Sequence, residues 1–239
     1  MTVVDAPSEA RAHLAVALDL DDSVAALRLA RELQPFFGVA KVGLELFTAA
    51  GPDVIGALVA LGYDVFADLK YHDIPTTVGK AARVVGSLGV RYLNFHAHGG
   101  VAMLRAGVEG LQLGALDAGL DATPTALAVT ILTSDSDAPP HILNKRVQAA
   151  LEAGCGGIVC AASDVTEAKQ YGPRLTAVVP GIRPSGAERH DQARAATPEY
   201  AIAAGADLLV IGRAVTQADD PAAAAAAVAE SVAASLGDL

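Results

Sequence analysis

The chain has 239 residues, of which 52% are hydrophobic, so it is long enough to bury a sizeable core. Aromatic residues make up only 4% and the net charge is −10, which argues against a nucleic-acid partner, because such proteins need basic patches and stacking rings. The first residues carry no basic, apolar leader, and the Ala-rich tail is too weakly hydrophobic to span a bilayer, so we expect a cytoplasmic protein with no membrane partner.

Short, almost wholly apolar runs recur along the chain, and each is followed by a helical pattern. Such runs are typical of strands that are buried on both faces of a parallel sheet. The eight runs are 14–19, 39–43, 63–70, 90–96, 126–132, 157–160, 175–179 and 208–212.

The intervening segments carry helix start signals, which are capping residues or a proline in the first turn. These signals are Asp21–Ser23, Pro52, Pro75, Thr197–Pro198 and Asp220–Pro221. Eight alternations without a break in composition predict an α/β protein with a single (β/α)₈ TIM barrel over residues 1–239, in which 1–12 form an N-terminal extension. A doubly wound open sheet is the structural alternative.

Two connections are longer and more polar than the others. Residues 133–140 are rich in proline and acidic or hydroxyl side chains, and residues 181–192 combine glycine, proline and several charges. Both follow strand runs, so both are expected on the carboxyl face of the barrel, where active sites occur. We interpret 181–192 as a loop that closes over a phosphate, with an ordinary surface loop as the alternative.

Charged residues stand at the ends of three apolar runs. Asp68 and Lys70 are two residues apart, so in a strand they point to the same side, and Asp73 follows in the turn. Lys41 and Asp19 end the two preceding runs. In a barrel these side chains converge on one mouth, where they form either a structural salt-bridge cluster or a site with shifted pKa values.

A second signal is typical of phosphate binding. Gly181–Arg183 follows the seventh run and Gly212–Arg213 follows the eighth. Many barrels bind phosphate with the loops after these two strands, and arginine offers a bidentate fork for phosphate oxygens. Three histidines, His72, His96 and His98, lie near the charged cluster, but their spacing matches no standard zinc pattern, so we expect no metal.

Together these residues resemble the orotidine 5′-phosphate decarboxylase family in its bacterial form. The resemblance extends from Ala15 to about Pro221 and is most specific at His72–Thr77 and Pro180–Arg183. The segments that carry it are 17–19, 41–47, 68–77, 128–134, 179–183 and 211–213. It implies a TIM-barrel lyase that converts orotidine 5′-phosphate to UMP and CO₂ without a cofactor, as the last step of de novo pyrimidine nucleotide biosynthesis.

The resemblance also implies roles for individual residues. Lys70 would protonate C6 of the pyrimidine after CO₂ leaves, and Asp68 would sit beside the substrate carboxylate. Lys41 and Asp73 would complete an alternating network of charges. The family further implies a homodimer, in which Asp73 and Thr77 reach into the neighbouring subunit's site.

The remaining expected contacts are with the substrate. Asp19 and Lys41 would bind the ribose hydroxyls, and Thr133 would lie near the pyrimidine. The 5′-phosphate would be held by four residues, Arg183, Gln192, Gly212 and Arg213.

Two other functions fit the same residues. Related barrels include metal-dependent sugar-phosphate decarboxylases and epimerases, which look similar at Asp68, Lys70 and Asp73 and would lose activity in EDTA. A non-catalytic nucleotide-binding barrel would bind UMP-like ligands without turnover, although the intact Lys70, Asp68 and Asp73 argue against it.

Overall fold

The structure is a computed structural model that describes residues 6–135, 138, 139, 141–184 and 194–237. Eight parallel strands close into a barrel, in which each strand pairs with the next and the last pairs with the first. The strands are β1 (Leu14–Ala17), β2 (Val39–Gly43), β3 (Asp64–Tyr71), β4 (Tyr92–His96), β5 (Thr125–Val129), β6 (Gly157–Val159), β7 (Thr176–Ile182) and β8 (Leu208–Ile211). The predicted (β/α)₈ barrel is confirmed, and closure rules out the open doubly wound sheet.

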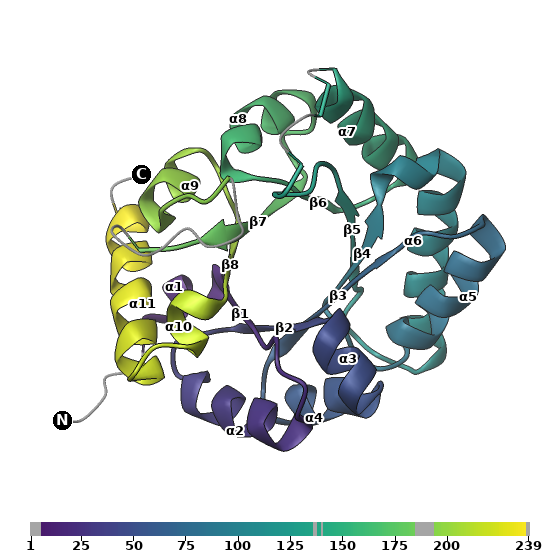
Figure 1. Cartoon of the computed structure of the whole chain (residues 1–239). Helices are drawn as coiled ribbons and strands as arrows, with labels where there is room; N and C mark the ends of the chain where they lie inside the picture. Colours follow the sequence, from purple (N-terminus) through teal and green to yellow (C-terminus); the bar gives the residue numbers. More distant parts are fainter. Residues whose placement is uncertain (1–5, 136–137, 140, 185–193, 238–239) are drawn as a thin grey trace.

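The helices lie outside the ring of strands (Figure 1). They are α1 (Ser8–Ala12), α2 (Ser23–Leu33), α3 (Leu44–Ala50), α4 (Asp53–Ala60), α5 (Pro75–Gly86), α6 (Gly100–Asp117), α7 (Ile142–Ala153), α8 (Ala162–Tyr171), α9 (Pro198–Ala203), α10 (Arg213–Thr216) and α11 (Pro221–Gly237), with a 3₁₀ turn, η1, at Ala97–Gly99. None of the helices in the described part of the chain is both long and apolar enough to cross a membrane.

Local sequence explains where several helices begin. Asp22 caps α2, because its Oδ1 atom accepts the N–H of Ala25 at 2.8 Å. Thr197 caps α9 by accepting the N–H of Tyr200 at 3.3 Å. Pro75 occupies the first turn of α5, where its missing N–H costs nothing. The expected N-terminal extension contains the short helix α1, which buries Ala10.

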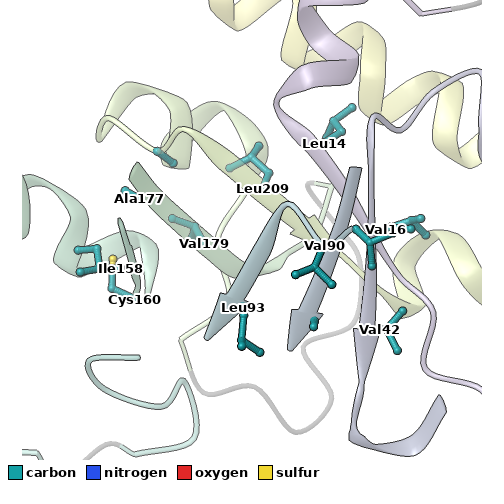
Figure 2. Packing of buried hydrophobic residues seen from close by; sticks show 14 of the residues in the cluster. Leu14, Val16, Val42, Val90, Leu93, Ile158, Cys160, Ala177, Val179 and Leu209 are labelled. Carbon is teal, nitrogen blue, oxygen red and sulfur yellow. The ribbon is translucent and has the colours of Figure 1, made fainter. Parts of the chain in front are cut away.

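Side chains alternate between two apolar layers along the strands. Outward-facing residues, such as Leu14, Val16 and Val42 in Figure 2, pack in the large core shared with the helices. Inward-facing residues form a smaller cluster that fills the barrel: Ala15, Ala17, Val39, Phe66, Leu127, Val129, Val159, Val178, Leu208 and Val210. The barrel interior is therefore a packed core rather than a pore.

The seventh strand continues further than the sequence predicted. Gly181 and Ile182 were expected at the start of the closing loop, but they belong to β7. The physical reason is further pairing, since Ile182 forms a bridge with Ala196 and the N–H of Arg183 donates to Ala196 O at 2.9 Å. The loop thus begins after this pairing, and its residues 185–193 lie outside the described part of the chain.

Candidate active site

A cavity of about 620 Å³ opens at the carboxyl ends of the strands, which is where barrel enzymes place their active sites. Apolar side chains from the barrel interior form its deeper lining: Ala17, Phe66, Val129, Val159 and Val210. Charged side chains follow on the same or neighbouring strands, closer to the mouth. The cavity therefore combines an apolar base with a charged wall.

Asp68 is at the centre of the charged wall. Its Oδ1 atom lies 2.6 Å from Lys70 Nζ, and its Oδ2 atom lies 3.3 Å from Lys41 Nζ. Lys41 Nζ also donates a hydrogen bond of 3.0 Å to Asp19 Oδ1. The four side chains alternate in sign, and this alternation offsets the cost of removing their charges from water.

Three neighbouring strands deliver these side chains. Lys41 occupies an inward position of β2, Asp68 and Lys70 occupy inward positions of β3, and Asp19 follows β1. Gly43 keeps space free between them, since a Cβ atom at this position would lie 2.9 Å from Asp19 Oδ1 and 3.0 Å from Lys41 Nζ. Any larger residue at position 43 would force one or both of these side-chain ends to shift.

The network keeps Asp68 and Lys41 charged. Burial by itself raises the pKa of Asp68, but the charges of Lys41 and Lys70, with hydrogen bonds from Lys70 and Asn94, outweigh burial and bring the pKa below its usual value. Burial by itself lowers the pKa of Lys41, but Asp68 and Asp19 outweigh it and raise that pKa above its usual value. Both groups are therefore ionised at neutral pH.

Lys70 has an unusual backbone conformation. Its φ is +48°, and no other non-glycine residue in the described part of the chain has a positive φ. Such a conformation costs a lysine on the order of 1–3 kcal/mol. It occurs where β3 bulges, because the pairing with β4 shifts register between Ala67 and Tyr71. The predicted common side of Asp68 and Lys70 is observed, but the regular strand assumed for them is wrong at this bulge.

A second wall of the cavity comes from the segments that follow the last two strands. Arg183 follows β7 and is buried, Gly212 follows β8, and Arg213 begins α10. Thr133, from the loop after β5, lines the cavity between the two walls. The two signals in the sequence, the alternating charges and the two Gly-Arg segments, therefore border one cavity.

The model of the orotidine 5′-phosphate decarboxylase / HUMPS family matches residues 12–228, which include every strand and both walls. The chain belongs to this family. The resemblance inferred from the sequence is thereby confirmed.

Individual relatives agree with this family across nearly the whole chain. A protein from Saccharophagus degradans named orotidine 5′-phosphate decarboxylase is 43% identical over 237 residues, covering 94% of this chain and 97% of that protein. One of the same name from an Anaeromyxobacter strain is 45% identical, covering 93% and 98%. The crystal structure of orotidine 5′-phosphate decarboxylase from Lactobacillus acidophilus matches with a TM-score of 0.73 at 34% identity, covering 92% and 98%.

Two expected site residues stand apart from the cavity lining, and a third is not described. Asp73 and Thr77 are exposed at the start of α5, and Asp73 Oδ1 accepts the N–H of Ile74 at 2.6 Å. Neither residue is among the described residues that line the cavity. Gln192 lies outside the described part of the chain.

The three histidines gather beside Lys70. The ring of His72 lies 5.8 Å from that of His96 and 5.6 Å from that of His98, measured between centroids. Burial, followed by the charge of His72 and then of Lys70, lowers the pKa of His96. Within the described ranges, no group of three or more histidine, cysteine or acidic side chains has a geometry that could hold a metal ion.

Sequence reasoning missed several polar residues near the site, among them Glu45, Gln217 and Asn94. Gln217, just after α10, lines the cavity beside Arg213. Asn94, in the middle of β4, is fully buried and donates a hydrogen bond of 2.6 Å to Asp68 Oδ1. The signal for Asn94 was present, because a polar residue at an inward position of an apolar strand needs a partner.

Proposed function

We propose that the protein is a carboxy-lyase that decarboxylates orotidine 5′-phosphate to UMP and CO₂, the last step of de novo pyrimidine nucleotide biosynthesis. The observation that carries the proposal is the placement of Asp68 between Lys41 and Lys70, in the same cavity as Arg183 and Arg213. Membership of the family supports the same reaction.

Lys70 would carry the chemistry. Cleavage of the bond between C6 and the carboxylate leaves an electron pair on C6, and CO₂ departs. The ammonium group of Lys70 stabilises the developing charge and then transfers a proton from Nζ to C6. The contact of 2.6 Å with Asp68 holds Nζ in place for this transfer. No cofactor takes part in these steps.

Asp68 would have a second effect on the bound substrate. Its carboxylate faces the position we assign to the substrate carboxylate, and two like charges about 4 Å apart repel by roughly 4 kcal/mol at an effective dielectric constant near 20. Departure of CO₂ removes this repulsion. The larger contribution is preorganisation, because Lys70 is already held where the negative charge develops.

The 5′-phosphate would bind at the second wall, after β7 and β8. Arg183, Gly212 and Arg213 line that side of the cavity. Gln192, with the loop that follows β7, would close over the phosphate. Asp19 and Lys41 would contact the ribose hydroxyls, and Thr133 the pyrimidine. Binding energy gained at the remote phosphate lowers the barrier where it favours the closed, water-free arrangement.

The active form would be a homodimer with shared sites. Asp73 and Thr77 are exposed on one chain and lie outside its own cavity lining, as expected of residues that complete a partner's site. Exposed apolar side chains accompany them just before α5 and on α5 and α6: Ile74, Val84, Leu113 and Leu116. Mixing an Asp73→Ala chain with a Lys70→Ala chain would then restore one intact site per mixed dimer, whereas unshared sites would show no complementation.

The deciding experiment is incubation with orotidine 5′-phosphate in EDTA, following the loss of the orotate chromophore. We expect full turnover in EDTA and no gain on adding Mg²⁺ or Zn²⁺. The proposed biosynthetic role also leads us to expect the protein in the cytoplasm. Activity that requires added metal would instead indicate a metal-dependent sugar-phosphate enzyme. Tight binding of UMP without turnover would indicate a non-catalytic barrel.

A further inference from the structure

The bulge in β3 lies opposite a single residue of β4. Ala67 pairs with Leu93 and Tyr71 pairs with Phe95, so Asp68, Leu69 and Lys70 all lie across from Asn94. A bulge of this kind leaves main-chain groups of the longer strand without their usual partners in the sheet.

The side chain of Asn94 supplies one of those partners. The N–H of Lys70 donates to Asn94 Oδ1 at 2.7 Å. The donor residue, Lys70, is the one non-glycine residue in the described part of the chain with a positive φ. The Asn94 carboxamide therefore holds the unusual backbone conformation that directs the Lys70 side chain.

The other end of the same carboxamide holds Asp68. Asn94 Nδ2 donates to Asp68 Oδ1 at 2.6 Å, and Lys70 Nζ contacts this same oxygen at 2.6 Å. Asn94 is fully buried and is not among the residues lining the cavity. Only a side chain with both an acceptor and a donor can make the two bonds together, which an asparagine provides at this length.

We propose that Asn94 is a positioning residue that fixes Lys70 and Asp68 relative to each other for proton transfer. The inference rests on the proposed decarboxylation and adds a residue to it. Because Asn94 does not border the cavity, it acts on the chemical step and leaves the grip on ribose and phosphate unchanged.

Two variants separate the two bonds. Asn94→Leu removes both while keeping the volume similar. Asn94→Asp retains the acceptor for the Lys70 N–H but replaces the donor with a second carboxylate next to Asp68. Carboxylates this close share a proton, whose loss with rising pH makes them repel. The other ionisable groups near this pair are Lys70, Lys41 beyond Asp68, and His96, the next inward residue of β4.

For Asn94→Leu we expect kcat for orotidine 5′-phosphate to fall by about 10²-fold, the size of effect expected when a reacting group such as the Lys70 ammonium is misplaced by about 1 Å. The Kd of UMP should stay within about threefold of the wild-type value. For Asn94→Asp we expect activity relative to wild type to fall as the pH rises from about 5 to about 8, as the shared proton is lost. A purely structural role would produce neither the split between kcat and Kd nor this additional pH dependence.

Thr130→Val is the matched control. Thr130 is also fully buried, and its hydroxyl donates to Val159 O at 3.0 Å, so the variant loses a buried hydrogen bond that involves neither Asp68 nor Lys70. We expect its kcat to stay close to wild type. A kcat for Asn94→Leu within about threefold of this control, or an Asn94→Asp pH profile parallel to wild type, would overturn the proposal.

A structural readout keeps this inference separate from the proposed function. Absence of turnover in the wild type would contradict the decarboxylation itself. Crystal structures of the wild type and Asn94→Leu still decide the positioning: we expect residue 70 to lose its positive φ and Lys70 Nζ to leave Asp68 Oδ1 in the variant. Retention of both features would refute the role of Asn94.

Discussion

The two ends of the barrel each carry a lysine–aspartate pair of nearly the same length. At the carboxyl end Lys70 Nζ lies 2.6 Å from Asp68, and at the amino end Lys169 Nζ lies 2.7 Å from Asp207. The residue types and distances are matched, so the difference between the pairs lies in what surrounds them.

Main-chain groups surround the pair at the amino end, Lys169 and Asp207, which we call the lower pair. Lys169 Nζ also donates to Leu175 O at 2.8 Å, and Asp207 Oδ2 accepts the N–H of Ala177 at 2.7 Å. His13 Nδ1 lies 2.8 Å from the carbonyl oxygen of Asp207. These bonds join the segments that lead into β1, β7 and β8, so the lower pair ties the start of three strands together.

The pair at the carboxyl end, Asp68 and Lys70, which we call the upper pair, has side-chain partners and borders a cavity. Asp68 contacts Lys41 and Asn94, and Lys70 lines the space proposed for the substrate. The comparison shows that a salt bridge at a strand end does not reveal its purpose by geometry alone. The other hydrogen bonds of the pair distinguish the two roles. A pair that also bonds to the backbone has a structural role, whereas a pair that faces a cavity is available for chemistry.

The largest expected effect tests the upper pair. Lys70→Ala removes the cation and the proton donor, so we expect kcat/KM for orotidine 5′-phosphate to fall by about 10⁴-fold or more. The free energy of unfolding should change little, because Asp68 keeps Lys41 and Asn94 as partners. Steady-state kinetics and urea unfolding measure the two quantities. An active Lys70→Ala variant would refute the role assigned to Lys70.

Arg213→Ala tests whether the chemistry of the upper pair depends on the second wall, where the phosphate would bind. Loss of a charged fork to the phosphate should lower kcat/KM by about 10²-fold, since hydrogen bonds between charged groups contribute the most. Arg174→Ala is the control, because Arg174 is exposed just before β7 at the amino end of the barrel. Equal activities of the two variants would show that Arg213 does not hold the phosphate.

Asp68→Asn connects the upper pair to stability. At neutral pH we expect the variant to be less stable by about 2 kcal/mol, because the buried Lys41 loses one of its two carboxylate partners. The pKa of Asp68 is lowered in the folded state, so this advantage of the wild type is present above the ordinary carboxyl pKa and is lost as the pH falls through the lowered value. Urea midpoints of both proteins across the acid range measure it. A difference that is constant with pH would contradict the charge network as its cause.

Periodicity predicted most of this fold. Each of the eight apolar runs overlaps a strand, because residues buried on both faces leave a strong hydrophobic signal. The end of β7 was misplaced, since Pro180 and Gly181 are typical of loops and the bridge that extends the strand joins Ile182 to the distant Ala196. The helix α3 follows β2 directly at Leu44, with no capping side chain to signal its start.

The site was predictable where it consists of charges and hidden where it depends on backbone shape. Lys41, Asp68 and Lys70 stand out because charges at the end of buried strands need partners. The positive φ of Lys70 could not be read from the sequence, because lysine gives no signal for that conformation and the bulge depends on pairing with β4. For Asn94 the sequence signals the need for a partner, but the identity of its two partners is defined only once the bulge has formed.

The smallest expected effect tests the lower pair and completes the comparison. Asp207→Asn keeps the shape of the side chain but weakens its bonds to Lys169 and to the N–H of Ala177, so we expect a loss of about 1–2 kcal/mol in the free energy of unfolding. The side chain of Asp207 is 44% exposed, and water screening keeps the loss at this modest size. Activity per folded molecule should stay at the wild-type level, because the pair lies at the other end of the strands. A drop in kcat without a drop in stability would mean that the amino end of the barrel also positions the site.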